Sequence, residues 1–144
     1  MVTDQAGVEG LIAHLENDPG SISIDAERAS GFRYSQKAYL IQISLRDKEI
    51  FMVDPIALSE SFEGWNQQLA QELNNRTWIL HAATQDLPCL AELGFTPQAI
   101  IDTELGARLA GFERVGLGSL VSELLEIELA KEHSAADWSL RPLS

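Results

Sequence analysis

A chain of 144 residues is long enough to bury its own core, and its length favours a single domain. Apolar residues make up 45% of it and charged residues 22%, as in ordinary globular proteins, and no apolar run could span a bilayer. The net charge of −12 argues against a protein that grips nucleic acid by broad electrostatics. A nuclease stays open, since bound divalent cations reverse the local field of the carboxylates that hold them.

Cysteine usage and the N-terminus bear on the compartment. Cys89 is the one cysteine, so an intrachain disulfide is excluded and a reducing compartment, the cytoplasm, is favoured. The N-terminus has no basic segment followed by an apolar stretch, so no secretory signal is expected. We therefore expect a cytoplasmic protein without a membrane partner.

The first half of the chain predicts a helix and then a three-stranded meander. Helical spacing of apolar residues predicts the helix, and short apolar runs bounded by turn residues predict the strands. The helix covers residues 5–17, and the strands cover 22–27, 38–45 and 49–53. A polar loop over 29–37 and a turn over 46–48 are expected to join the strands.

The second half changes period and alternates helix with strand. Its predicted elements, in order, are a helix through Phe62, Trp65, Leu69 and Leu73, a strand over 78–80, a helix from Thr84 or Gln85 to Leu93 that Gly94 caps, a strand over 99–102, and helices over 104–109 and 117–125. The pattern predicts an α/β fold: a mixed sheet, with three antiparallel strands and then alternating helix and strand, flanked by helices.

Two carboxylates, Asp25 and Glu27, end the first predicted strand. Alternate strand residues share a face, so both side chains point the same way. Like charges on one face repel unless a cation lies between them, and hard ions such as Mg²⁺ or Mn²⁺ suit oxygen ligands. A solvated strand end is the competing interpretation, and the triplet alone favours it.

A third carboxylate, Asp86, follows the strand over 78–80 and lies at the start of a helix. The helix dipole favours a negative charge there, which is the simple explanation. The functional alternative is that the helix start aims Asp86 at the same metal ions. His81 ends the strand, where a lone His is more often packed or hydrogen-bonded than a ligand.

The polar tail from Lys131 to Ser144, which includes His133, is typical of a solvated surface. Trp138 lies between Asp137 and Arg141 in this tail and indicates a loop that packs back onto the domain. Gly116 and Gly118 lack the third glycine and the preceding strand of a phosphate-binding loop, so they predict a turn and the start of a helix.

Six segments in this order resemble one family. They are Ile24–Glu27, Ala38–Ser44, His81–Leu87, Ile101–Glu104, Gly116–Leu120 and Ser134–Leu143. Together they cover nearly the whole chain, and it resembles the ribonuclease D group of DEDD-type 3′→5′ exonucleases, which have the ribonuclease H-like fold. The resemblance implies a hydrolase that acts in RNA processing, removing nucleoside 5′-monophosphates from the 3′ end of single-stranded RNA or DNA.

The resemblance also assigns roles to residues. It implies that Asp25, Glu27 and Asp86 are catalytic and hold two Mg²⁺ or Mn²⁺ ions, with Asp25 between both ions. It implies that Asp102 is structural and caps the next helix. Contacts with the nucleic acid are expected from five residues: Ala26, His81, Gln85, Trp138 and Arg141.

One part of the family's pattern is missing. Its third motif, a Tyr followed four residues later by the last metal-binding Asp, should come after the Trp138 segment. No Tyr follows Tyr39 and no Asp follows Asp137. We therefore expect residues 1–144 to be an exonuclease domain without this motif and without the family's C-terminal helical nucleic-acid-binding module, and to be inactive or impaired alone.

Two other expectations follow from the same gap. One is a non-catalytic domain that keeps the fold and binds nucleic acid or protein, although three retained carboxylates argue against a long loss of catalysis. The other is self-association through an apolar edge that the missing helix would otherwise cover. The coding sequence after Ser144 would distinguish a non-catalytic domain from an exonuclease, since a downstream Tyr-x-x-x-Asp would complete the active site.

Overall fold

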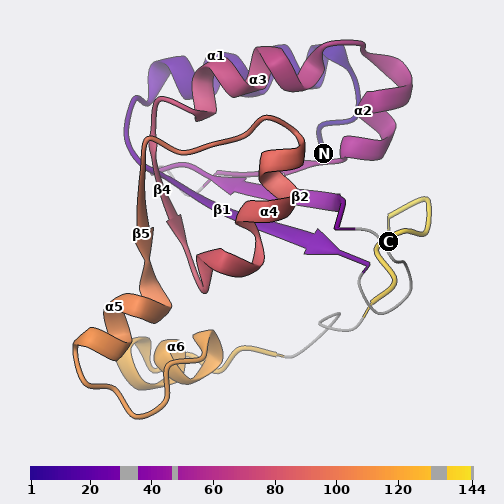
Figure 1. Cartoon of the computed structure of the whole chain (residues 1–144). Helices are drawn as coiled ribbons and strands as arrows, with labels where there is room; N and C mark the ends of the chain where they lie inside the picture. Colours follow the sequence, from indigo (N-terminus) through magenta and orange to yellow (C-terminus); the bar gives the residue numbers. More distant parts are fainter. Residues whose placement is uncertain (30–35, 47–48, 131–135, 144) are drawn as a thin grey trace.

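A five-stranded mixed sheet organises the computed structural model, which describes residues 1–29, 36–46, 49–130 and 136–143 (Figure 1). The strands are β1 (Ile22–Arg28), β2 (Ala38–Ser44), β3 (Ile50–Val53), β4 (Thr77–Leu80) and β5 (Ala99–Asp102). Their order is β3-β2-β1-β4-β5, with the first three antiparallel and β4 and β5 parallel to β1. The predicted α/β class and its three-strand meander are confirmed.

Six helices and one 3₁₀ turn surround the sheet in the described part of the chain. They are α1 (Gln5–Asn17), α2 (Pro55–Ser61), α3 (Trp65–Leu73), η1 (Ala83–Gln85), α4 (Leu87–Glu92), α5 (Thr103–Leu109) and α6 (Leu117–Leu125). Figure 1 shows α1 and α3 side by side over the sheet, and the buried side chains of α4, Cys89 and Leu90, join the same core as those of α1 and α3. Helices α5 and α6 lie together beyond the end of β5. None of the helices in these ranges is both long and apolar enough to cross a bilayer.

The central strand β1 has two different faces. Ile22, Ile24 and Ala26 alternate along it and are buried in the core, while Asp25 lies on the opposite face and is exposed. β1 pairs with β2 from Ser23 to Arg28, but its pairing with β4 is confined to Ile22 and Ser23. The chain that follows β4 therefore passes beside the carboxylate end of β1.

Two helix starts differ from the sequence prediction for reasons that involve proline. Helix α2 was not predicted: Asp54 caps it, accepting from the N–H groups of Ile56 and Ala57, and Pro55 occupies its first turn. Phe62 is the C-cap of α2, so the next helix begins at Trp65.

The helix predicted from Thr84 or Gln85 begins later. Residues Ala83–Gln85 form the η1 turn, and α4 starts at Leu87. Pro88 is tolerated in the first turn of a helix but would break an interior one, so the helix cannot start much earlier. The predicted loop over 29–37, the turn over 46–48 and the tail around His133 lie mostly or wholly outside the described residues.

A buried arginine fastens α1 to the sheet. Arg76 is 7% exposed and follows α3. Its guanidinium donates to backbone carbonyls at the end of α1 and in the turn before β1: Leu15, Asp18 and Gly20. The last carbonyls of α1 have no partners within the helix, so the guanidinium of Arg76 provides hydrogen bonds that these carbonyls would otherwise lack in the interior.

We expect Arg76→Met to lower the free energy of unfolding by about 3 kcal/mol, because it leaves these carbonyls unpaired in the interior. Urea denaturation followed by circular dichroism measures the loss. Arg108→Met is the matched control, because Arg108 is exposed and its ion pair in the described residues is with Glu104 of its own helix, so its loss should stay within about 0.5 kcal/mol. Equal losses in both variants would contradict this role for Arg76.

Candidate active site

The predicted carboxylate pair lies on one face of β1. Asp25 is exposed and Glu27 is half-buried, and the strand alternation directs both away from the core, as the sequence predicts. Ala26 between them is 6% exposed and points the other way, into the core. A contact of Ala26 with a ligand on the carboxylate face would therefore have to come from its backbone.

Asp86 lies between η1 and α4 and is 5% exposed. It occupies the N-cap position of α4, but its side chain makes no capping hydrogen bond. Its backbone N–H donates to the carbonyl of Ala83, and its own carbonyl accepts from the N–H of Leu90 at 3.1 Å and from Cys89 Sγ at 3.0 Å. Helix capping by hydrogen bonding therefore does not explain a buried carboxylate here.

The negative charges of the three carboxylates oppose one another's ionisation. Burial raises the pKa of Asp86 to about 6, the charges of Asp25 and Glu27 raise it as well, and Arg28 partly opposes them. Burial also raises the pKa of Glu27, again with Asp25 adding to the effect and Arg28 opposing it. The structure thus brings together residues from β1 and from the start of α4 that are about sixty positions apart in the chain.

Arg28 is the nearby cation that sequence analysis missed. It directly follows Glu27 in β1. Its positive charge acts to lower the pKa values of Glu27, Asp86 and Cys89, each of which is raised on balance. Its effect does not offset burial and the neighbouring carboxylates together, since the pKa values of Glu27 and Asp86 remain raised. A sequence signal was available, because a cation adjacent to an Asp-x-Glu triplet tempers its repulsion.

The donor set fits a hard divalent cation. Carboxylate oxygens are the preferred ligands of Mg²⁺ and Mn²⁺, and a positive ion would relieve the repulsion that raises the pKa values. In the described ranges, however, no three His, Cys, Asp or Glu side chains are already gathered closely enough to hold an ion. The three carboxylates interact electrostatically, but their oxygens are not close enough together to bind one ion.

Asp102 fixes the turn that carries Asp86. Its carboxylate accepts hydrogen bonds of 2.9–3.2 Å from the backbone N–H groups of Ala82, Ala83, Glu104 and Leu105. Burial raises the pKa of Asp102, but these four donors outweigh that effect and lower it. The predicted capping role is confirmed, and the bonds to Ala82 and Ala83 add a second role, because Ala82 has a left-handed φ of 56° that an L-residue rarely adopts.

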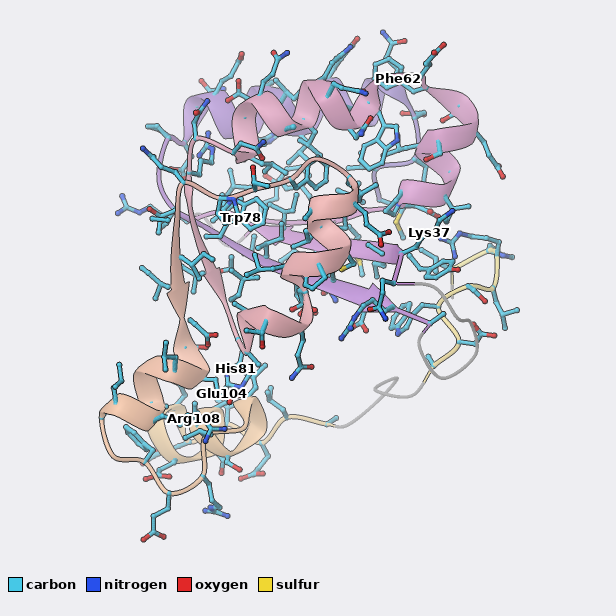
Figure 2. All side chains as sticks on the ribbon, viewed as in Figure 1. Lys37, Phe62, Trp78, His81, Glu104 and Arg108 are labelled. Carbon is cyan, nitrogen blue, oxygen red and sulfur yellow. The ribbon has the colours of Figure 1, made fainter. Side chains whose placement is uncertain are left out.

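His81 is held at the end of β4, and Figure 2 labels it close to α5. The Thr103 hydroxyl donates to the carbonyl of Leu80 at 3.1 Å, so it must accept from His81 Nδ1, 2.9 Å away. In the neutral imidazole this network places the proton on Nδ1 and makes Nε2 the acceptor. Gln85 is exposed in η1. The predicted nucleic-acid contacts of His81 and Gln85 stay predictions.

The C-terminal segment, residues 136–143, packs back onto the domain as Trp138 indicated. Arg141 reaches from it to Asp54 at 2.8 Å and to the Tyr39 carbonyl at 2.9 Å. Trp138 is half-buried, and the segment curls around a hollow of about 400 Å³. The structure thus places Trp138 and Arg141 together on the β2 and β3 side of β1, while His81 follows β4 on the other side of β1, beside α5 (Figure 2).

Comparison with known proteins defines the class. A family model described as the 3′-5′ exonuclease matches residues 1–144, so the chain belongs to the 3′→5′ exonuclease family, which are hydrolases acting on nucleic acids. It is similar to ribonuclease D from Desulfotalea psychrophila, with 37% identity over 126 residues, covering 86% of this chain and 33% of that protein. The chain spans about a third of the length of the curated relatives it matches.

Solved structures agree. A crystal structure of a protein from Bifidobacterium adolescentis is 42% identical, with a TM-score of 0.92, and the match covers 100% of this chain and 34% of that one. Brucella melitensis NrnC with bound Mg²⁺ is 25% identical, with a TM-score of 0.66, covering 86% of this chain and 60% of that one. The predicted ribonuclease H-like fold and the resemblance to ribonuclease D are confirmed.

We expect Asp86→Asn to stabilise the metal-free chain at pH 8. The pKa of Asp86 is raised from 3.8 to about 6, so the folded form is penalised increasingly as pH rises between these two values, and the penalty is fully present above pH 6. The variant should gain on the order of 2 kcal/mol at pH 8 and little at pH 4. Urea denaturation with a chelator present, at both pH values, measures the difference.

Asp102→Asn serves as the control of opposite sign. The pKa of Asp102 is lowered, so its stabilising effect is present at neutral pH and fades as pH falls through that lowered value. This variant should lose stability at pH 8. If the gain in stability of Asp86→Asn over the wild-type chain were the same at both pH values, the buried-charge explanation would be contradicted.

Proposed function

We propose that this chain carries the metal-binding half of a two-metal 3′→5′ exonuclease site, with Asp25, Glu27 and Asp86 as the ligands. The observation that supports it is the mutual repulsion of three carboxylates from β1 and the start of α4, of which Asp86 is 5% exposed and makes no side-chain capping hydrogen bond in the described part of the chain. A structural role gives no reason to bury such a charge. Mg²⁺ and Mn²⁺ suit these ligands equally.

When bound, two such ions supply an activated water and stabilise the departing 3′ oxygen of the terminal phosphodiester. Asp25, the most exposed of the three, would face both ions. Glu27 would hold one ion and meet the 3′ end, and Asp86 would help to hold the other. The side chains have to turn toward a common point, and Glu27 and Asp86 have to be deprotonated, so metal affinity should rise with pH.

The substrate we propose is the 3′ end of single-stranded RNA or DNA, from which nucleoside 5′-monophosphates are released. Trp138 offers an aromatic face on which a base can stack. Gln85 and His81 Nε2 offer hydrogen-bonding groups, Ala26 could contribute its backbone, and Arg141 acts through the segment that it anchors. A net charge of −12 means that bound cations, rather than a basic groove, must attract the strand.

Metal binding tests the ligand assignment directly. We expect calorimetry to detect Mn²⁺ binding that Asp25→Asn weakens more than about tenfold, since even outer-shell partners of metal ligands typically contribute 10–100-fold. Asp4→Asn is the matched control, because Asp4 caps α1 and Asn is an equally good cap, so Mn²⁺ affinity should not change. The same loss in both variants, or no binding by the wild-type chain, would contradict the assignment.

These 144 residues contain no Tyr after Tyr39 and no Asp after Asp137, so we expect them to be inactive or severely impaired on their own. The assay is release of mononucleotides from a 3′-labelled single-stranded oligonucleotide with Mg²⁺ or Mn²⁺. Robust release that Asp25→Ala abolishes would overturn the expected impairment and support the site. Membership of the exonuclease family does not favour the non-catalytic alternative.

The lone, buried Cys89 supports a reducing compartment, for which we propose the cytoplasm.

We also propose self-association through one apolar face. Four large side chains of β5 and α6 that line this face are 49–62% exposed: Ile101, Leu117, Leu124 and Leu125. Between α5 and α6 lies a hollow of about 490 Å³ with a mainly apolar lining. Contiguous apolar surface of this kind is unusual on a monomer.

Light scattering should show a dimer or larger species at high protein concentration. Added salt should promote it, because salt screens the repulsion between chains of charge −12. Leu124→Lys, in the wall of the hollow, should restore the monomer, and Leu140→Lys, an exposed leucine outside this face, should not. A monomer under all conditions would contradict the proposal.

A further inference from the structure

Two side chains, Asp54 and Arg141, join the C-terminal segment 136–143 to the sheet. Asp54 directly follows β3 and is 4% exposed, and its Oδ1 accepts a hydrogen bond from Arg141 Nη2 at 2.8 Å. The same nitrogen donates to the carbonyl of Tyr39, near the start of β2, at 2.9 Å. The ion pair therefore fixes the segment where β3 ends and β2 begins.

Arg141 also organises the segment from within. Its Nη1 donates to the carbonyls of Trp138 and Leu140, each at 2.8 Å. Counting Asp54 and Tyr39, the guanidinium donates to four protein oxygens, and it has five N–H groups in all. Its charge faces a nearly buried carboxylate. An arginine engaged in this way has little left to offer a phosphate.

The anchoring point is close to the carboxylate end of β1. In the antiparallel register Glu27 lies opposite Leu40 and Arg28 lies opposite Ala38, with Tyr39 at the irregularity between them. The carbonyl that Arg141 holds is therefore one residue from the partner of Glu27. Figure 1 shows the segment, in yellow, beside the end of the β1 arrow.

We propose that Asp54 and Arg141 are positioning residues that hold the 136–143 segment, with Trp138, beside the carboxylates, where it lines the path of a nucleic-acid strand. Arg141 acts by holding this segment and does not touch a phosphate, which revises the direct contact expected from the sequence. The inference rests on the proposed exonuclease function, because it assigns these residues a part in binding single-stranded nucleic acid.

Salt dependence of binding distinguishes a tether from a phosphate contact. The probe is a 5′-fluorescein-labelled single-stranded RNA with a 3′-terminal phosphorothioate, followed by fluorescence anisotropy with Mg²⁺ over a range of salt concentrations. The variants are Arg141→Gln, which removes the charge, and Asp54→Ser, which keeps a side chain able to cap α2 but is too short to reach Arg141.

A tether predicts that each variant weakens binding on the order of tenfold, and that the double variant is no weaker than the worse single one. It predicts no change in the slope of log affinity against log salt concentration. A phosphate contact predicts instead that Arg141→Gln reduces this slope by about 0.7 and that Asp54→Ser leaves binding unchanged or tightens it. That second pattern would overturn the inference.

Fluorescence quenching by acrylamide reads the position of the segment without nucleic acid. Trp65 and Trp78 are 3% and 0% exposed, so the quenched emission belongs to Trp138, and Trp138→Phe verifies this. Both tether variants should raise quenching equally, whereas no rise would refute the tether. If the wild-type chain fails to bind RNA, the proposed function and the nucleic-acid part of this inference fail, while quenching still decides whether Asp54 and Arg141 hold the segment.

Discussion

Repulsion among Asp25, Glu27 and Asp86 is the constraint around which this end of the sheet is arranged. Burial and neighbouring negative charge both oppose ionisation of Asp86, so the metal-free chain keeps this group at an energetic disadvantage at neutral pH. Arg28 offsets only part of that disadvantage. Such a cluster is understandable in a protein whose ligand is positive, and it explains how an acidic chain can belong to a family of nucleic-acid hydrolases.

The backbone around Asp86 keeps the carboxylates near one another despite that repulsion. Asp102, at the end of β5, binds the N–H groups of Ala82 and Ala83 and so holds a left-handed turn directly after β4. Because β4 pairs with β1 only at Ile22 and Ser23, this turn can bring the start of α4 beside the rest of β1. One carboxylate with a lowered pKa thus helps to position another whose pKa is raised.

Sequence periodicity predicted most of the fold, because alternation in strands and helical spacing are local properties. The meander, the β4 and β5 strands and the α5 and α6 helices all follow from it. Helix α2 was not predicted, because Asp54-Pro55 at its start was interpreted only as the end of a strand. The shared face of Asp25 and Glu27 was predictable from strand geometry, whereas the proximity of Asp86 depends on tertiary structure and entered the prediction only through family resemblance.

The partners of Arg141 could not be predicted from the sequence. The family resemblance implied a contact with nucleic acid, and in the structure the guanidinium binds a buried aspartate and three backbone carbonyls. Nothing local in the sequence indicates that Asp54, 87 positions earlier, is its partner. The apolar face of α5 and α6 is a similar case, since periodicity predicts an apolar side of each helix but not what covers it.

The most direct test of the shared carboxylate site is an NMR pH titration of the side-chain carboxyl carbons, with and without Mg²⁺. Without metal, the pKa of Asp86 should lie at about 6 and that of Glu27 above its ordinary value, with Asp102 below its own. Saturating Mg²⁺ should lower the pKa values of Asp86 and Glu27 together and leave Asp102 unchanged. An ordinary pKa for Asp86, or one that Mg²⁺ does not move, would contradict a metal site built on Asp25, Glu27 and Asp86.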